Sequence, residues 1–144
     1  MARHRGGAAV VFAIAVLFVA AVGGFILYLR AGTMREADVL IQGDSLVITG
    51  QYGVTYRLDD IQDVHASNAL PSVGRKVNGA GLSGVRKGDY EVEGLGTARL
   101  FLHSSSGPYL YLKVNDKWTI LSFPDGGKTT AILDRIRSAW DGGD

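Results

Sequence analysis

An uncharged apolar run near the N-terminus constrains this chain more than any other feature. The run extends from Gly7 to Leu29, with Arg5 before it and Arg30 after it. As a helix, these 23 residues would reach roughly 34 Å, enough to cross a hydrocarbon core of about 30 Å. A buried helix of a small soluble domain is seldom apolar on all sides over such a length. The sequence therefore predicts a basic N-terminus and a single transmembrane helix over residues 1–30.

A cleaved secretory signal is the alternative interpretation of this segment, because Arg3 and Arg5 form a short positive region before the apolar run. The run is longer than the 7–15 residues typical of a signal. It also continues for several large apolar residues beyond the small pair Ala20-Ala21. These features favour a retained anchor in the cell membrane. Lysines and arginines are balanced across the span, so the free amino group decides the orientation and favours a C-terminal domain outside the cytoplasm.

The rest of the chain is predicted to form a polar juxtamembrane linker, residues 31–36, followed by one domain, residues 37–144. Four of the 15 Lys and Arg residues flank the apolar run, and one of the 14 acidic residues, Glu36, precedes the domain. The domain thus has 11 basic and 13 acidic residues, a net charge of −2 that argues against nucleic-acid binding. The chain has no cysteine, which excludes disulfides, thiolate metal sites and thiol nucleophiles.

Short stretches rich in β-branched and aromatic residues, separated by turn residues, predict a mainly β domain with seven strands. These strands are expected at residues 39–41, 45–49, 54–58, 90–92, 97–103, 109–114 and 118–123. A helical turn is predicted at residues 58–64, where Ile61 and Val64 lie three positions apart. One amphipathic helix is predicted at residues 129–140, with Trp140 as its most buried residue. This pattern indicates an antiparallel barrel or sandwich covered by a C-terminal helix.

Several segments together resemble the bacterial pleckstrin-homology-like domain family. They are DSLVITGQYGVTYRLDDIQDV from residue 44, the pattern P-x-x-x-R-K-x-N-G from residue 71, KGDYEVEGLGTARLFLHSSSGPYLYL from residue 87, and the terminal helix. The resemblance implies a strongly bent, seven-stranded antiparallel barrel or sandwich capped by the helix. Members of the family are seldom enzymes, so it implies an interaction module with no catalytic residue and no cofactor. Arg75, Asn78 and Gly79 match the family's most recognisable loop without acquiring a function from it.

The glycine-rich stretch from Gly74 to Gly88 is the strongest candidate for a ligand site. Glycines allow backbone N–H groups to converge on an anion, and nearby cations add charge. The candidate ligand-binding residues are Arg75, Lys76, Asn78, Gly79, Arg86 and Lys87. The ligand would be an anionic lipid headgroup or a small anion. The competing interpretation is that the glycines form sharp turns and the cations are solvated, since no phosphate-binding glycine motif is present.

Three other groups of residues are weaker candidates. His103 and Ser104 are neighbours on a predicted strand and point to opposite faces, so they do not form a catalytic pair. Asp59, Asp60, Asp63 and His65 lie close in sequence, yet carboxylates at that position cap a helical turn more often than they bind metal. Phe101, Tyr109 and Tyr111 form a docking patch if they face outward and belong to the core if they are covered.

These observations lead to the hypothesis of a non-enzymatic, single-pass membrane protein that presents an interaction domain at the bilayer surface. Its expected partner is another protein or a second copy of itself, with neither metal nor nucleic acid. The alternative hypothesis is a sensor of an anionic ligand or lipid headgroup that uses Arg75, Lys76, Arg86 and Lys87. Convergence of these four cations on one surface would favour the sensor, whereas their dispersal would favour protein docking.

Overall fold

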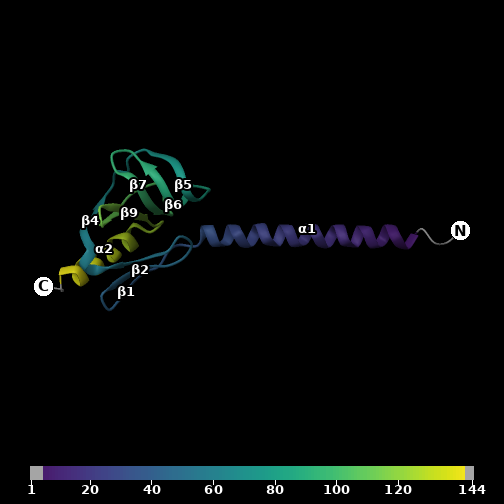
Figure 1. Ribbon diagram of the computed structural model, residues 1–144, viewed down its shortest axis with the longest axis horizontal. Coiled ribbons are helices and arrows are strands. Elements are labelled where there is room, and N and C mark those ends of the chain that lie inside the picture. The colour runs from purple at the N-terminus through teal and green to yellow at the C-terminus, as the bar shows by residue number, and fades with distance from the viewer. Residues whose placement is uncertain (1–4, 142–144) are drawn as a thin grey trace. The chain divides into compact units, whose positions relative to one another are not determined.

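The structure, a computed structural model, describes residues 5–141 (Figure 1). The chain divides into two compact units that meet between Gly32 and Thr33. The first unit is helical. The second unit contains all the strands of the described residues and the C-terminal helix.

The first unit consists of helix α1 (Arg5–Met34), whose last two residues belong to the second unit. Its large apolar side chains are exposed on all sides, with Phe12, Phe18 and Tyr28 at 72%, 69% and 76% exposure. Over Gly7–Met34 it is long and apolar enough to cross a membrane, and it is the one such helix among residues 5–141. The predicted apolar helix is therefore present, and it continues five residues beyond Leu29.

The described part of the second unit contains nine strands in two sheets. Figure 1 shows how these sheets lie with respect to helix α2. The smaller sheet has the order β1-β2-β3 and the larger one the order β4-β8-β9-β7-β6-β5. All pairs are antiparallel except β7 with β9, which run parallel. The strands are β1 (Val39–Gln42), β2 (Ser45–Ile48), β3 (Val54–Arg57), β4 (Ile61–Ser67), β5 (Val73–Leu82), β6 (Val85–Val92), β7 (Gly96–Leu102), β8 (Tyr109–Val114) and β9 (Lys117–Ser122).

The mainly β class and all seven predicted strands are confirmed, but the strand count and the purely antiparallel pairing were wrong. One additional strand is β4, which replaces most of the predicted helical turn and leaves only η1 (Leu58–Asp60) helical. The pairing of β4 with β8 shifts register between Ile61 and Asp63. This bulge lets Ile61 and Val64, three residues apart, both face the core and so imitate helical spacing. The other additional strand, β5, pairs with β6 across the stretch expected to be a glycine-rich loop.

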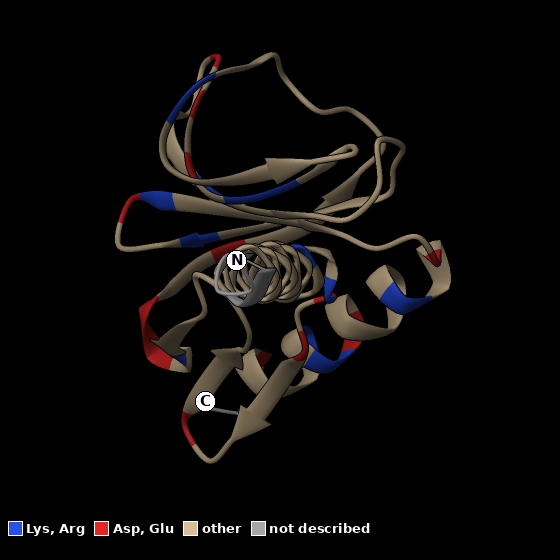
Figure 2. Ribbon diagram, turned by 90° about the vertical axis from the view of Figure 1, so that its right-hand side faces the viewer, with Lys and Arg blue, Asp and Glu red and all other residues tan. Residues whose placement is uncertain are grey.

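Two hydrophobic clusters occupy the two faces of the larger sheet. The main cluster lies between one face of that sheet, the smaller sheet and helix α2 (Gly126–Asp141), and includes Leu46, Phe101, Leu112 and Ile136. The second cluster covers the opposite face, under the connection from β4 to β5. There the hydroxyl of Tyr111 donates to the Ala69 carbonyl at 2.7 Å. The two sheets bend around these cores and remain separate rather than closing into one barrel (Figure 2).

The aromatic residues considered as a docking patch belong to these cores. Phe101 is fully buried in the main cluster, while Tyr109 and Tyr111 are 4% and 5% exposed in the second one. They lie on opposite faces of the sheet because Phe101 pairs with Lys87 on the side of the smaller sheet, whereas Tyr111 pairs with Ile120. An outward patch of these three side chains is therefore ruled out.

Helix α2 confirms the predicted C-terminal helix, with one correction. Its buried residues are Thr129, Ile132, Leu133 and Ile136. Trp140, expected to be the most buried, is only partly buried at the edge of the main cluster. Trp140 lies in the last turn, one residue before the helix ends at Asp141. The helix begins beside Asp125, whose carboxylate accepts the Gly127 N–H at 2.9 Å and so caps the first turn.

Candidate functional site

The glycine-rich candidate segment forms the β5–β6 hairpin. Gly79 and Gly88 face each other in this pair, and Gly88 has a φ of 109°. A Cβ on Gly79 would overlap the Lys87 carbonyl, and one on Gly88 would overlap the Asn78 carbonyl. These glycines therefore permit a close backbone approach between two strands. Asn78 and Gly79 belong to the strand ladder itself.

The four cations of the hairpin are dispersed. Arg75 forms an ion pair with Glu91 at 2.9 Å on the surface. Lys87 is 1% exposed and its ammonium donates to the backbone carbonyl of Arg35. Burial lowers the pKa of Lys87. Lys76 and Arg86 are exposed on different strands, so the structure does not bring the four cations to one surface, and basic and acidic positions are interspersed over the domain (Figure 2).

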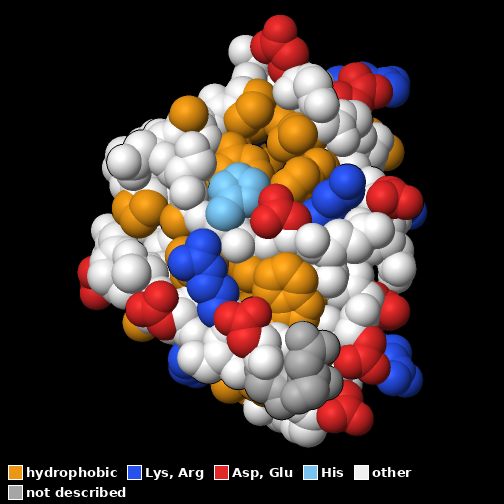
Figure 3. All heavy atoms as spheres, turned by 90° about the vertical axis from the view of Figure 1, so that its left-hand side faces the viewer, with side chains coloured by type: hydrophobic (Ala, Val, Ile, Leu, Met, Phe, Trp, Pro, Cys, Tyr) orange, Lys and Arg blue, Asp and Glu red, His pale blue; other side chains and the backbone are white. Residues whose placement is uncertain are grey.

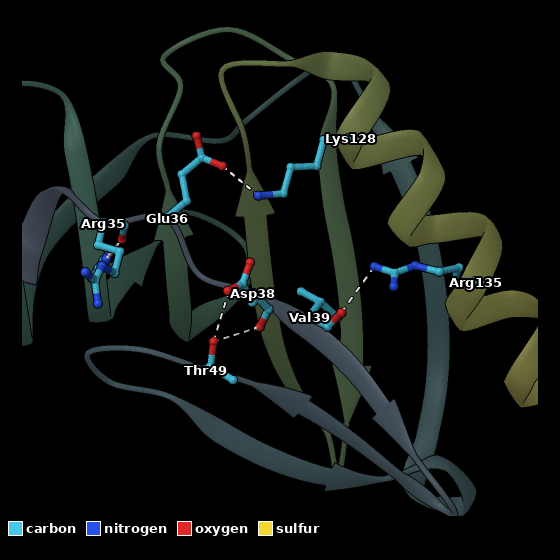
Figure 4. A network of polar contacts seen from close by, with 8 residues as sticks. Arg35, Glu36, Asp38, Val39, Thr49, Lys128 and Arg135 are labelled. Carbon is cyan, nitrogen blue, oxygen red and sulfur yellow. Dashed lines mark hydrogen bonds and ion pairs between the residues drawn. The ribbon is translucent and has the colours of Figure 1, made fainter.

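The buried Lys87 instead belongs to a set of contacts that hold the segment immediately after α1. Figure 4 shows the contacts of Glu36, Asp38 and Val39 in this set. We call residues 35–39 the docked segment. Lys87 on β6 binds the Arg35 carbonyl, and Lys128 on α2 forms an ion pair with Glu36 at 2.6 Å. Ala37, between these two attachments and β1, is 1% exposed.

The second half of the docked segment is held through its own backbone groups. Thr49 donates its N–H to the Asp38 carbonyl at 2.9 Å, and its hydroxyl accepts the Asp38 N–H at 3.1 Å. Arg135 on α2 donates to the Val39 carbonyl at 3.2 Å. Strand β6, helix α2 and Thr49, which follows β2, thus hold five consecutive residues. Of the six residues expected to form a linker, 31–36, the first four belong to helix α1, and Arg35 and Glu36 belong to the docked segment.

A buried histidine lies among the groups that hold this segment. His103 is 8% exposed and stacks on Phe123 with 6.4 Å between ring centroids. The Lys128 ammonium lies over the same Phe123 ring, 4.5 Å from its centroid. The buried Nε2 atom of His103 has no hydrogen-bond partner among residues 5–141. Burial lowers the pKa of His103 to about 4, and the charges of Lys87 and Lys128 act in the same direction against the opposing effect of Glu36.

A cleft of about 280 Å³ lies between the two sheets on the side of β3. Arg99 lines this cleft and donates to both carboxylate oxygens of Asp89, at 2.9 and 3.0 Å. Near it, the Tyr56 hydroxyl and the Thr119 hydroxyl are 2.7 Å apart and join β3 to the larger sheet. The cleft is lined by Val54, Tyr56, Asp89, Thr97, Arg99, Lys117 and Trp118.

Asp59, Asp63 and Ser104, among the remaining sequence candidates, have structural partners. Asp59 pairs with Arg57 at 3.2 Å, and Asp63 with His65 at 2.9 Å. Residue 57, not Asp59 or Asp60, is the N-cap of η1, and no side chain caps this turn. Among residues 5–141, no three His, Cys, Asp or Glu side chains gather as metal ligands would. Ser104 bonds to the Ser106 carbonyl at 2.9 Å, as expected for a turn.

The chain matches no known protein family, no curated protein and no solved structure. Its functional features therefore have to be judged from its own geometry. Sequence reasoning considered Lys87 and His103 in other roles and missed the docked segment altogether. The only local signal was the alternation of β6, which places Lys87 on the face opposite Tyr90 and hence toward the main core.

Removal of the Lys87 ammonium is expected to loosen the docked segment. In Lys87→Met the side chain keeps most of its length but loses the hydrogen bond to Arg35. A charged hydrogen bond of about 1.5 kcal/mol corresponds to roughly tenfold more frequent opening. The measurement is the rate of tryptic cleavage after Arg35 in the full chain in micelles, followed by mass spectrometry. The control Lys76→Met, at an exposed position on β5, should leave this rate unchanged. Equal rates in both variants would show that Lys87 does not hold the segment.

Proposed function

We propose that this protein is a non-enzymatic, single-pass membrane protein that presents its β-rich domain as a protein-interaction module at the bilayer surface. Helix α1 would be the anchor, and the domain would lie outside the cytoplasm. We further propose that the domain is an open relative of the pleckstrin-homology-like fold. In support, bent sheets precede a C-terminal helix that packs on the core, in the order that the resemblance implies.

The docked segment is the observation that carries this proposal. Buried contacts fix the first residues after a membrane-length helix. Ordering these residues costs conformational entropy. Such an arrangement is of use when the position of the domain relative to its anchor matters for what the domain binds. A domain that only needed a tether could keep a solvated polar linker.

The surface of the domain is consistent with protein recognition rather than anion capture. Figure 3 shows a face on which hydrophobic side chains, a histidine and charges of both signs are interspersed. Protein interfaces have this mixed character, with apolar groups surrounded by a polar rim. The sensor hypothesis needs a concentration of cations. Of the four hairpin cations, Lys76 and Arg86 are exposed and form no ion pair with another residue of 5–141.

Proximity labelling in native membranes tests the proposal. A labelling enzyme is fused to the C-terminus of the full chain and, as a control, directly to residues 1–34. We expect a reproducible set of extracytoplasmic proteins that only the full-chain fusion labels. Identical sets from both fusions would contradict a binding role for the domain. Labelling of cytoplasmic proteins alone would reverse the proposed orientation while leaving the interaction role in place.

A further inference from the structure

The outer edge of β3 presents unpaired backbone groups. The Leu58 N–H donates to the Asp44 carbonyl at 2.8 Å. Because every second residue of β3 bonds to β2, this bond shows which residues face β2 and which face outward. Tyr56 and Val54 therefore bond to β2, whereas the N–H and C=O groups of Thr55 and Arg57 point away from it. Since β3 is the last strand of its sheet, no other strand of the described chain receives these groups.

The opposite edge of the same sheet is treated differently. On β1 the outward carbonyl of Val39 accepts a hydrogen bond from Arg135, and α2 lies against this strand. An unpaired edge invites the addition of another strand, and covering it is one way to prevent this. The small sheet thus has one covered edge and one open edge.

The open edge lies beside the cleft between the sheets. Val54 and Tyr56 point into this cleft, while Thr55 and Arg57 are exposed. A strand added along β3 would direct every second side chain over the cleft, toward Thr97, Arg99 and Asp89. Its volume, about 280 Å³, is at the small end for a ligand pocket and suits individual side chains of an extended segment.

Charge indicates the chemistry of that segment. Arg99 is neutralised by the two hydrogen bonds to Asp89. Lys117, on the wall of the cleft, forms no ion pair with any described residue. The cleft therefore carries one uncompensated positive charge, which a carboxylate of an incoming strand would balance.

We propose that the β3 edge binds an extended acidic segment of a partner protein as a fourth strand, with a carboxylate of that segment facing Lys117. This inference rests on the proposed function, because it names the position and the chemistry of the recognition that the module performs. Backbone hydrogen bonds to Thr55 and Arg57 supply affinity, and the cleft supplies the side-chain preference.

The test uses the full chain in nanodiscs of uncharged phosphatidylcholine, probed with a display library of random ten-residue peptides. We expect enriched peptides to contain Asp or Glu and to lack proline in the bound stretch. Thr55→Pro removes the outward N–H at an edge position that tolerates proline, and should weaken binding of the enriched peptides roughly tenfold or more. Thr55→Val keeps this N–H and is the matched control, which should bind as the wild type does.

A second variant makes the test independent of how well Thr55→Pro folds. Lys117 is exposed, and the Lys117→Glu variant should change the selected peptides from acidic to basic. Absence of any enriched peptide, equal binding by Thr55→Pro, or an unchanged charge preference in Lys117→Glu would overturn the proposal. A dimer that Thr55→Pro dissociates, without peptide enrichment, would assign the edge to a second copy instead. If the proximity-labelled set persists in a Thr55→Pro full-chain fusion, the interaction module stands and only the β3 site fails.

Discussion

Replacement of Gly88 by alanine is expected to lower the free energy of unfolding by about 4 kcal/mol or more, through two separate effects. The first is strain, because a residue with a side chain at a φ of 109° costs about 1–3 kcal/mol. The second is overlap of the new Cβ with the Asn78 carbonyl and the Cα of Gly79 on the neighbouring strand. Backbone atoms of a paired strand have little freedom to move, so β5 would separate from β6.

Gly84→Ala is the matched control for this variant. Gly84 lies in the turn of the same hairpin with a φ of 82°, and a Cβ there would meet open space. The Gly84→Ala variant therefore isolates the conformational strain. We expect it to lower the free energy of unfolding by about 1–2 kcal/mol. Both values come from urea unfolding of the full chain in micelles, followed by the fluorescence of the two tryptophans, Trp118 and Trp140, in the β-rich unit. Equal losses in the two variants would mean that β5 and β6 do not approach closely at Gly88.

Acidification from pH 7 to pH 4 is expected to remove up to about 3 kcal/mol of stability through His103 alone. Its pKa is about 4 in the folded protein and about 6.5 in an unfolded chain. Since the pKa is lowered on folding, the contribution of the neutral imidazole is fully present above pH 6.5. It is lost as the pH falls, because between 6.5 and 4 the unfolded state binds a proton that the folded state does not accept.

The variant His103→Gln should reduce this pH dependence. The difference in unfolding free energy between wild type and variant should change by up to about 3 kcal/mol between pH 7 and pH 4, since glutamine does not titrate. His103→Leu gives a second, apolar replacement in case the amide is poorly accommodated. His65→Gln, at a half-exposed position on β4, serves as the control. A constant difference across this pH range in both His103 variants would show that the imidazole is not buried in its neutral form.

Features encoded within a single stretch of sequence were predictable. The membrane-length helix and α2 follow from apolar periodicity, and the seven predicted strands from alternation between turn residues. The strand β4 was missed because the bulge between Ile61 and Asp63 gives its apolar residues a spacing of three. The strand β5 was missed because its glycines serve a close backbone approach to β6, and that need becomes visible only when both strands are placed together.

The candidate sites were less accessible to sequence reasoning because their partners are distant in the chain. The docked segment depends on pairs 52, 92 and 96 residues apart, joining Lys87 to Arg35, Lys128 to Glu36 and Arg135 to Val39. No window of local pattern contains both members of such a pair. Lys87 was considered a ligand-binding cation for this reason, since the alternation of β6 indicates the face on which Lys87 lies but not the distant carbonyl that it binds.

For the proposed function, the docked segment also limits where the domain could search for a partner. Only five residues separate Leu29, the end of the apolar run, from Arg35, where docking begins. Even a fully extended chain covers only about 20 Å between these two residues. In the proposed function the apolar run lies in the membrane, and the domain would meet partners by lateral diffusion within a thin layer over the lipid. A modest affinity then suffices, because confinement raises the local concentration of every partner that shares the same membrane.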